Sequence, residues 1–528
     1  MAETPPSSPA TTTPLCGAAA FLAACRAAGM DTCLANPGTT ELAFVRAFDD
    51  VPGWRIVPAL FEGVVTGAAD GYARMLGRPA LTLTHLGPGF ANGIANLHNA
   101  RRAHSAVVNV IGDHTVAHLP FDSALTSDID SLARPVSAWI THINRADEAV
   151  PAATAAVTQA CSNGGQIATV VFAADAQAAP APGIATEPLA ISTTRARAAD
   201  AVIAEAARRL QAPRSLLVIG GDALSAEGLD AAQRIAAATG ARLYCETFPA
   251  RIERGHDLPA PERFPYFPEP AFALIGEVDH VIVAGTPEPV TYFGYPNFPS
   301  QIVPADKLVM LAGPLDAAAD ALVRVAARLG AHTAPAISRP RPPRHAEPGP
   351  VDNLKAARII AAWLPDDAIV SIEGGTLGYP FFTASAASAR HTVLTNTGGA
   401  IGQGLPVGTG AALACPGRRV VCVQSDGSAQ YTVQSLWTMA RERLAVTIVI
   451  AANQRYAVLQ NELARDGMQS ISGAAATLTS LADPPLDWVA LAQGYGVPGC
   501  AVRSGAELEA ALDASLGVAG PYLIELLL

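Results

Sequence analysis

The sequence predicts an α/β protein of three domains, each a doubly wound parallel sheet with helices on both faces. Short β-branched runs alternate with Ala- and Leu-rich helical stretches, which is typical of parallel sheets joined by helical crossovers. The 528 residues exceed what a single hydrophobic core supports. Two proline-rich stretches interrupt the alternation and separate three such regions.

The expected strands are short and apolar, and they are bounded by Gly, Asp or Asn, as strands buried on both faces tend to be. The clearest are Ala106–Ile111, Ala168–Phe172, Leu216–Ile219, His280–Ala284, Ala368–Ile372, Val420–Val423 and Val446–Ala451. Glycine-rich turns follow strands in the first and last regions of the chain, whereas the middle region is plainer.

Domain boundaries follow from the two stretches that break the pattern. Ala174–Pro188 is rich in Ala and Pro, and Thr333–Pro350 is dense in proline, so both are expected to be extended linkers. The segment Met1–Pro14 is rich in Pro, Ser and Thr and is expected to be a disordered lead-in. The expected domains are therefore residues 15–175, 190–332 and 352–528.

Composition excludes several classes of protein. Half of the residues are apolar, but no run free of Gly, Pro and charge reaches the roughly 20 residues that span a bilayer. The net charge is −11 without an offsetting Lys/Arg cluster, so neither a membrane nor a nucleic acid is an expected partner. Eight scattered cysteines without a CxxC pair, and an N-terminus without a signal pattern, indicate a cytoplasmic enzyme with reduced thiols.

The densest chemical signal lies between Gln424 and Leu459, where two buried strands each end in a polar loop. Asp426 and Asn453 would bring oxygen ligands to the same edge of a parallel sheet, where α/β proteins bind ligands. Mg²⁺ prefers such ligands and is commonly shared with substrate phosphates. Gly427 lets the backbone approach a phosphate, and Ser428 begins a helix whose N–H groups favour anions.

These two loops resemble the signature of the thiamine-diphosphate-dependent enzymes that include acetolactate synthases and benzoylformate decarboxylases, Gly-Asp-Gly followed by Asn-Asn. Ser425 replaces the first Gly and Ala452 the first Asn, while Asp426 and Asn453 are kept, 27 positions apart. The similarity to benzoylformate decarboxylase-like proteins continues beyond the signature, through the helix between the loops. Within the group, the whole chain most resembles the short acetolactate synthase large-subunit-like proteins.

The resemblance implies how the diphosphate half of the cofactor is held. Asp426, Asn453 and the backbone carbonyl of Arg455 are expected to bind Mg²⁺ on the diphosphate. The residues expected to contact the cofactor in this domain are Gly375, Thr376, Gly399, Ile401, Gly427, Ser428 and Tyr456. The backbone carbonyl of Gly399 would receive the 4′-amino group of the pyrimidine, and Ile401 would bend the cofactor.

A nicotinamide-binding fold is the alternative for this region. Gly408-Thr409-Gly410 followed by Asp426 faintly matches a dinucleotide fingerprint. These glycines do not directly follow a strand, and Leu413 fills the last small-residue position, so this alternative is weak.

The N-terminal region resembles the pyrimidine-binding half of the same family. Glu62 heads a helix of small residues that ends Ala-Asp-Gly-Tyr-Ala-Arg, and the resemblance implies that its carboxylate binds ring N1′ and promotes loss of the C2 proton. His85 matches an active-site histidine of benzoylformate decarboxylases and could act as a general acid or base. Pro37 and Asn92 are expected to contact the cofactor, and Thr39 the substrate carboxylate.

Two departures from the family pattern bear on the substrate, and one feature bears on a second cofactor. The stretch Pro287–Gly294 carries no histidine, although benzoylformate decarboxylases use one from their middle domain. Leu459 and Glu462 are expected to face the substrate, with Glu462 where relatives place an aromatic residue. The middle domain offers no match to the FAD site of acetolactate synthases, so FAD is not expected.

The resemblance implies a thiamine-diphosphate- and Mg²⁺-dependent 2-oxo acid decarboxylase or carboligase. Its partners would be a 2-oxo acid and an aldehyde or keto acceptor. A flavin-dependent oxidase of the same fold and a non-catalytic regulatory homologue are the alternatives, and retention of Glu62 favours an enzyme. Glu62 and the Asp426–Asn453 pair lie in separate domains, and the resemblance implies that one cofactor meets both across a two-fold interface. A homodimer, or a tetramer of two such dimers, is therefore expected.

Overall fold

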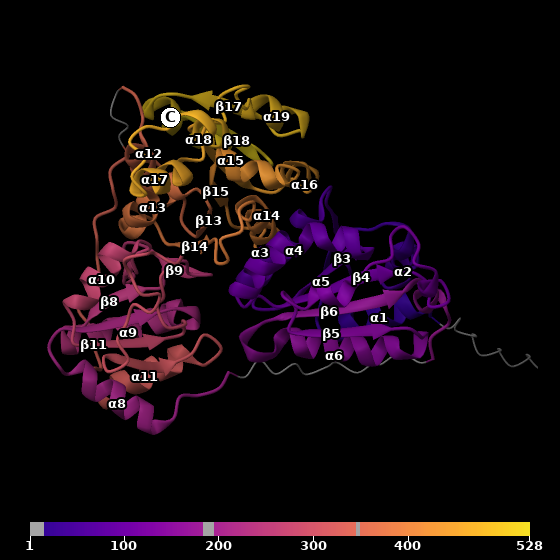
Figure 1. The fold of residues 1–528 in the computed structure, drawn as a ribbon, viewed down its shortest axis with the longest axis horizontal. Coiled ribbons are helices and arrows are strands. Elements are labelled where there is room, and N and C mark those ends of the chain that lie inside the picture. The colour runs from indigo at the N-terminus through magenta and orange to yellow at the C-terminus, as the bar shows by residue number, and fades with distance from the viewer. Residues whose placement is uncertain (1–14, 183–194, 345–348) are drawn as a thin grey trace, which may run out of the picture.

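The N-terminal domain is built on a six-stranded parallel sheet of order β2-β1-β3-β4-β6-β5. In this computed structural model, residues 15–182, 195–344 and 349–528 are described (Figure 1). The strands are β1 (Thr32–Asn36), β2 (Arg55–Pro58), β3 (Ala80–His85), β4 (Val107–Asp113), β5 (Trp139–Ile143) and β6 (Ile167–Ala173). The main helices are α1 (Gly17–Ala27), α2 (Leu42–Asp50), α3 (Glu62–Leu76), α4 (Leu86–Arg102), α5 (Ile129–Ala133) and α6 (Ala149–Cys161).

The central domain is smaller, with a five-stranded parallel sheet of order β10-β8-β7-β11-β12. Its strands are β7 (Ser215–Ile219), β8 (Arg242–Cys245), β10 (Glu262–Arg263), β11 (His280–Ala284) and β12 (Leu308–Ala312). Its helices are α8 (Asp200–Leu210), α9 (Ala226–Thr239), α10 (Pro268–Gly276) and α11 (Ala318–Arg328). The chain reverses direction across the sheet between β7 and β11, the point where doubly wound sheets offer a ligand crevice.

The C-terminal domain has a seven-stranded sheet of order β17-β18-β16-β15-β13-β14-β9. Its own strands are parallel: β13 (Ala368–Ile372), β14 (His391–Thr395), β15 (Val420–Ser425), β16 (Val446–Ala452), β17 (Gly499–Val502) and β18 (Tyr522–Leu527). The helices are α12 (Asn353–Trp363), α13 (Gly375–Ala384), α14 (Gly404–Ala414), α15 (Asp426–Ala429), α16 (Ser435–Arg441), α17 (Ala457–Arg465), α18 (Gly473–Thr479), α19 (Trp488–Gly494) and α20 (Gly505–Leu516). The predicted fold class is confirmed, and all seven strands expected from the sequence are present within two residues of their predicted ends.

The structure differs from the expectation at two places. The short strand β9 (Ile252–Arg254) comes from the region expected to be central domain, yet it pairs antiparallel with β14 in the C-terminal sheet. The extended linker predicted over Ala174–Pro188 is wrong for its first residues, because α7 (Ala174–Ala178) forms there and buries Ala176 and Gln177. Its last residues and the lead-in Met1–Pro14 lie outside the described residues.

The second predicted linker agrees with the structure where the chain is described. Residues 333–344 form neither helix nor strand, and residues 345–348 lie outside the described part. All eight cysteines are free thiols. None of the helices in the described residues is both long and apolar enough to cross a membrane.

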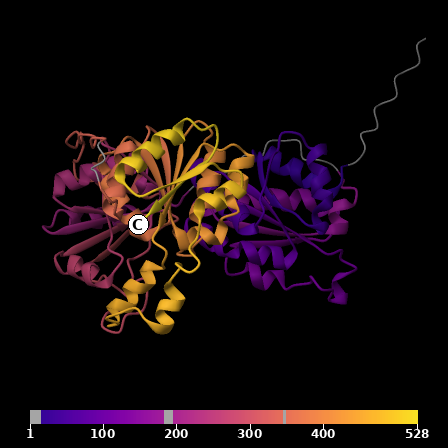
Figure 2. The same cartoon turned by 90° about the horizontal axis from the view of Figure 1, so that it is seen from above.

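The N-terminal and C-terminal domains meet where α3 lies against α14 (Figure 1). A Cβ at Gly71 would overlap the Val407 carbonyl, and one at Gly410 would overlap the Ala68 carbonyl. Only glycine permits this approach of two helix backbones. Viewed from above, the N-terminal domain lies to one side of the other two (Figure 2).

Candidate active site

Glu62 is the first residue of α3, and its side chain is buried at the carboxyl edge of the N-terminal sheet, with 8% of the residue exposed. Its Oε2 accepts a hydrogen bond from Asn92 Nδ2 at 3.0 Å. Gly89 lies against the same carboxylate and leaves no room there for a larger residue. Two residues predicted separately from the sequence, Glu62 and Asn92, are thus in direct contact.

His85 ends β3 and forms a pair with Glu41, a residue absent from the sequence predictions. The His85 Nδ1 atom lies 2.9 Å from Glu41 Oε2, and Glu41 is completely buried. Glu41 also accepts the Gly38 N–H at 2.7 Å and the Thr40 hydroxyl at 2.6 Å. With its carboxylate accepting, Glu41 favours the proton on Nδ1 and orients the imidazole, and Nε2 has no hydrogen-bond partner among the described residues.

Glu41 could not be identified from local sequence. It lies in the 3₁₀ turn Thr39–Glu41 after β1, where an acidic residue is usually solvated. Only the parallel pairing of β1 with β3 brings this turn to the end of the strand that carries His85. Thr39, predicted to contact the substrate, is exposed in this turn, and Pro37, predicted to contact the cofactor, is exposed just before it.

Asp426 lies at the junction of β15 and α15 and is 2% exposed. Its two carboxylate oxygens accept backbone N–H groups of Gly427 at 2.9 Å and of Gln454 at 2.6 Å. Burial raises the pKa of this carboxyl group, and a nearby cation would favour the charged form. The Gln454 contact joins the two loops that follow the neighbouring parallel strands β15 and β16.

The donor atoms around Asp426 suit magnesium. Asn453 Oδ1 accepts the Arg455 N–H at 3.1 Å within the second loop. Nowhere in residues 15–182, 195–344 and 349–528 do three or more His, Cys, Asp or Glu side chains gather as a metal site. One carboxylate, one amide and a backbone carbonyl remain as donors, a set that Mg²⁺ completes with phosphate oxygens and water.

At the N-terminus of α13, several hydrogen-bonding groups have no partner among the described residues. Thr376 is the second residue of α13, and its buried hydroxyl has no partner within the described chain. The N-cap residue, Gly374, provides no side-chain cap, so the first N–H groups of this helix also await an acceptor. A buried hydroxyl beside a helix N-terminus is suited to a phosphate group.

The other residues predicted to contact the cofactor from this domain lie next to Asp426, in the loop after β16, or in the loop between β14 and α14. Gly427 packs under the ring of Tyr456, with no space for a Cβ between them. The Ser428 hydroxyl donates to the Ser425 carbonyl at 3.2 Å. Gly399 has a φ of +78°, a conformation that favours glycine, and within the described chain its carbonyl accepts no hydrogen bond.

The central domain places Tyr292 in the stretch where the sequence lacks a histidine. A Cβ on Gly399 would clash with the Tyr292 hydroxyl, so this hydroxyl lies at the same loop as Ile401. Rings of Phe248 and Tyr266 pack on Tyr292 at centroid distances of 5.5 Å and 4.9 Å. Burial raises the pKa of Tyr292, so at neutral pH its hydroxyl is protonated and can donate.

The two residues predicted to face the substrate from α17 have different surroundings. Leu459 is 51% exposed. Glu462 lies 3.4 Å from Arg465, which in turn binds Glu269 of the central domain at 2.8 Å. The second carboxylate oxygen of Glu462 is buried without a partner in the described residues.

Most of the predicted residues gather in two groups, which are called half-sites below. Glu62, His85, Asn92, Pro37 and Thr39 gather at the carboxyl edge of the N-terminal sheet. The other half-site lies at the carboxyl edge of the C-terminal sheet and contains Gly375, Thr376, Asp426, Gly427, Ser428, Asn453, Arg455 and Tyr456. Among the described residues, no hydrogen bond joins the Glu62 carboxylate to the second half-site.

Two family models match the chain. The N-terminal TPP binding domain of thiamine pyrophosphate enzymes matches residues 16–133, and the C-terminal TPP binding domain matches residues 378–526. These ranges contain the two half-sites, apart from Gly375 and Thr376.

Relatives that align over nearly their full length indicate the same family. The chain is 44% identical to IlvX of Mycobacterium tuberculosis, whose assignment as an acetolactate synthase large subunit is provisional, over 94% of this chain and 96% of the relative. It is 30% identical to benzoylformate decarboxylase of Pseudomonas aeruginosa, with the same coverage. The 4-hydroxybenzoylformate decarboxylase of Rhodococcus jostii has the same fold, with a TM-score of 0.84 at 24% identity over 97% of this chain and 98% of that one.

Proposed function

Because the chain belongs to the thiamine pyrophosphate enzymes, we propose that it is a thiamine-diphosphate- and Mg²⁺-dependent decarboxylase or carboligase of 2-oxo acids. The observation that carries the proposal is the composition of the two half-sites. One offers a buried carboxylate, Glu62, and an oriented imidazole, His85. The other offers a buried acid, Asp426, beside an unpartnered hydroxyl at a helix N-terminus.

Each residue then has a defined task. Asp426, Asn453 and the Arg455 carbonyl would hold Mg²⁺, while Thr376 and the N-terminus of α13 receive the diphosphate. When bound, the cofactor supplies a nucleophilic carbon and an electron sink next to the keto group. Glu62 would accept a hydrogen bond from the aminopyrimidine ring, and His85, oriented by Glu41, would move a proton at the substrate.

One contact in the central domain supports the proposal that the enzyme does not bind FAD. Gly221 follows β7 at the switch point of the sheet, where a nucleotide diphosphate would seek backbone N–H groups. The Glu246 carboxylate instead accepts this N–H at 3.2 Å and the Thr286 hydroxyl at 3.2 Å. Burial raises the pKa of Glu246 to about 7, and a diphosphate would have to displace this side chain.

We further propose that the working enzyme is a homodimer or a pair of dimers, in which the half-sites of two chains meet. Large apolar side chains are exposed on the N-terminal domain near its half-site. Leu60 is 50% exposed, two residues before Glu62, and Leu42 and Phe121 are 52% and 75% exposed. Burial of these side chains against a second copy would favour association.

Turnover of a panel of 2-oxo acids tests the proposed activity. Purified protein supplied with thiamine diphosphate and Mg²⁺ is incubated with each acid, with and without an aldehyde acceptor. Mass spectrometry then separates decarboxylation products from carboligation products. Absence of any product across the panel, or absence of cofactor binding, would remove the proposal.

The isosteric change Glu62→Gln is expected to bind the cofactor nearly normally and to lose activity by about 100-fold, because an amide cannot exchange a proton with the ring. The loss should appear as slowed hydrogen–deuterium exchange at C2, measured by quenched-flow NMR. Exchange at the wild-type rate would show that another group activates the cofactor.

His85→Ala is expected to lower kcat by about 100-fold while leaving cofactor affinity unchanged, since it removes a proton-transfer group. Glu41→Gln should lower kcat by a smaller factor, because the imidazole remains but loses its acceptor. The matched control is His142→Ala, which breaks a surface pair with Asp130 of similar length, 2.8 Å. Rates of all variants are compared between about pH 5 and 8. An unaltered pH–rate profile in His85→Ala would make His85 a packing residue.

A further inference from the structure

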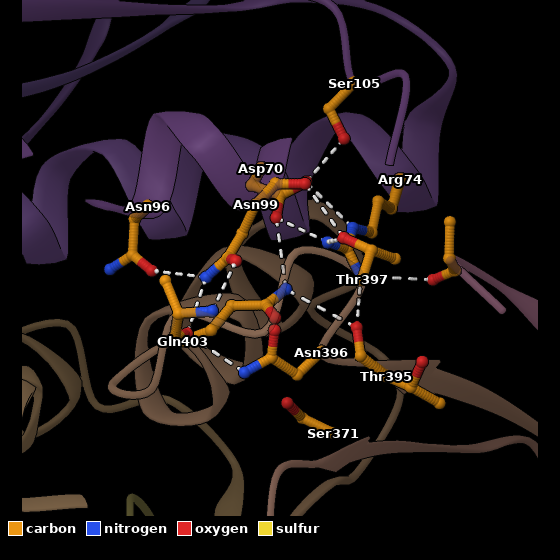
Figure 3. A network of polar contacts seen from close by, with 12 residues as sticks. Asp70, Arg74, Asn96, Asn99, Ser105, Ser371, Thr395, Asn396, Thr397 and Gln403 are labelled. Atoms are coloured by element: carbon orange, nitrogen blue, oxygen red, sulfur yellow. Dashed lines mark hydrogen bonds and ion pairs between the residues drawn. The ribbon is translucent and has the colours of Figure 1, made fainter. Parts of the chain in front are cut away.

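The loop between β14 and α14 carries Gly399 and Ile401, and a residue of the N-terminal domain of the same chain holds it in place (Figure 3). Asn99, from α4, is completely buried. Its Nδ2 donates to the Ala400 carbonyl at 2.8 Å, and the Ala400 N–H donates to Asn99 Oδ1 at 3.2 Å. The side-chain amide thus pairs with both polar groups of Ala400, as a neighbouring strand would.

Further contacts between the two domains fix the rest of the loop. The Thr397 hydroxyl donates to the Asn99 carbonyl at 2.8 Å, and His98 Nε2 lies 3.1 Å from the Gly398 carbonyl. Within the loop, Asn396 Nδ2 donates to the Ala400 carbonyl at 2.9 Å. The carbonyls on either side of Gly399 are therefore occupied.

These contacts occupy some backbone carbonyls of the loop and leave others free. Of the carbonyls from residue 398 to residue 402, those of Gly398, Ala400 and Gly402 accept hydrogen bonds. Within the described residues, those of Gly399 and Ile401 accept none. The contacts made by Asn99 leave open the one carbonyl assigned to the amino group of the pyrimidine.

A buried ion pair on α3 contacts both ends of the loop. Arg74 binds Asp70 at 2.7 Å and 2.6 Å and donates to the Thr395 carbonyl at 2.8 Å (Figure 3). Gln403 Nε2 donates to Asp70 Oδ2 at 3.2 Å. Both ends of the loop are thereby attached to α3 through a buried ion pair, and breaking such a pair is costly.

We propose that Asn99 is a positioning residue for the cofactor site on the C-terminal domain of its own chain. This rests on the proposed function and on the proposed pairing of half-sites between chains. Glu62, at the N-terminal end of α3, and Asn92, in the N-terminal half of α4, would serve the cofactor bound by a second copy. Asn99, farther along α4, would instead shape the loop that receives the cofactor of the first copy. One pair of helices would then act on two active sites.

Calorimetric titration of thiamine diphosphate into protein with saturating Mg²⁺ tests the role of Asn99. In Asn99→Ala the loss of the paired hydrogen bonds is expected to weaken binding about ten- to a hundredfold. Asn99→Asp, which keeps the shape and the acceptor but loses the donor to Ala400, should weaken binding as well.

The matched control is Asn109→Ala. Asn109 is equally buried in the same domain and is bonded to Thr82 and Thr169, away from the loop. Its loss should lower the melting temperature without changing cofactor affinity. If wild-type protein binds the cofactor and folded Asn99→Ala binds it within about twofold of wild type, the inference is wrong. If wild-type protein does not bind, the proposed function fails, and the inference fails with it.

Mixed dimers test which site Asn99 serves. In a dimer of one Glu62→Gln chain and one Asp426→Ala chain, the only intact site combines Glu62 of the second chain with Asp426 of the first. Adding Asn99→Ala to the Glu62→Gln chain should weaken cofactor binding at that site about tenfold or more. Adding it to the Asp426→Ala chain should not, although that chain supplies the N-terminal half-site. The opposite pattern would show that Asn99 acts across the interface together with Glu62.

Discussion

Asp426→Ala is expected to abolish retention of thiamine diphosphate. Asp426 supplies the only carboxylate among the proposed magnesium donors, and it also accepts the Gln454 N–H that joins the two loops. Even outer-shell partners of a metal change its affinity by roughly 10- to 100-fold, so loss of a ligand should cost at least about 100-fold. Calorimetry with thiamine diphosphate and Mg²⁺ measures the change directly.

A second aspartate provides the control for this variant. Asp222, in the central domain, also accepts two backbone N–H groups, from Ala318 at 3.0 Å and Ala319 at 3.3 Å, and burial also raises its pKa. Asp222→Ala should destabilise the fold comparably while the cofactor still binds. Equal cofactor affinities for wild type and Asp426→Ala would remove the metal assignment, since magnesium would then be held by other groups.

The three α/β domains could be predicted from the sequence because their strands and helices are marked by local sequence patterns. A buried parallel strand such as Val446–Ala452 is apolar at all but one position, so its type and position can be predicted without knowing its neighbours. The loops that end such strands are marked by their polar residues, which is how Asp426 and Asn453 stand out. For the same reason β9 could not be predicted, because three residues pair across a domain boundary with nothing local to mark them.

The supporting residues of the site were not predictable for a different reason. Glu41, Tyr292 and Asn99 contact residues far away in the chain: His85, Gly399 and Ala400. A buried polar residue has the same local sequence pattern whether its partner is catalytic or structural. The residues that bind a cofactor can therefore resemble a family motif, whereas the residues that orient them emerge only when the strands are paired and the domains packed.

The second large effect is expected when two inactive variants are combined in one dimer. Glu62→Gln and Asp426→Ala proteins should each be inactive alone, because every site in each homodimer lacks one essential carboxylate. Within one described chain, the Glu62 carboxylate is bonded to Asn92 of its own domain, and no hydrogen bond links it to the metal loop. If two chains build each site, a mixed dimer carries one site with both substitutions and one site with neither.

Co-expression of the two variants with different affinity tags and tandem purification would isolate these mixed dimers. Random pairing of equal amounts should restore about one quarter of wild-type activity per chain, and purified mixed dimers about one half. The matched control is a mixed dimer of Glu62→Gln with Glu62→Gln/Asp426→Ala, in which no intact site can form and no activity should return. If each site were built within a single chain, every site in the first mixture would also keep one lesion. Inactive mixed dimers would then contradict the two-chain site, because association alone cannot repair a carboxylate missing from the same chain.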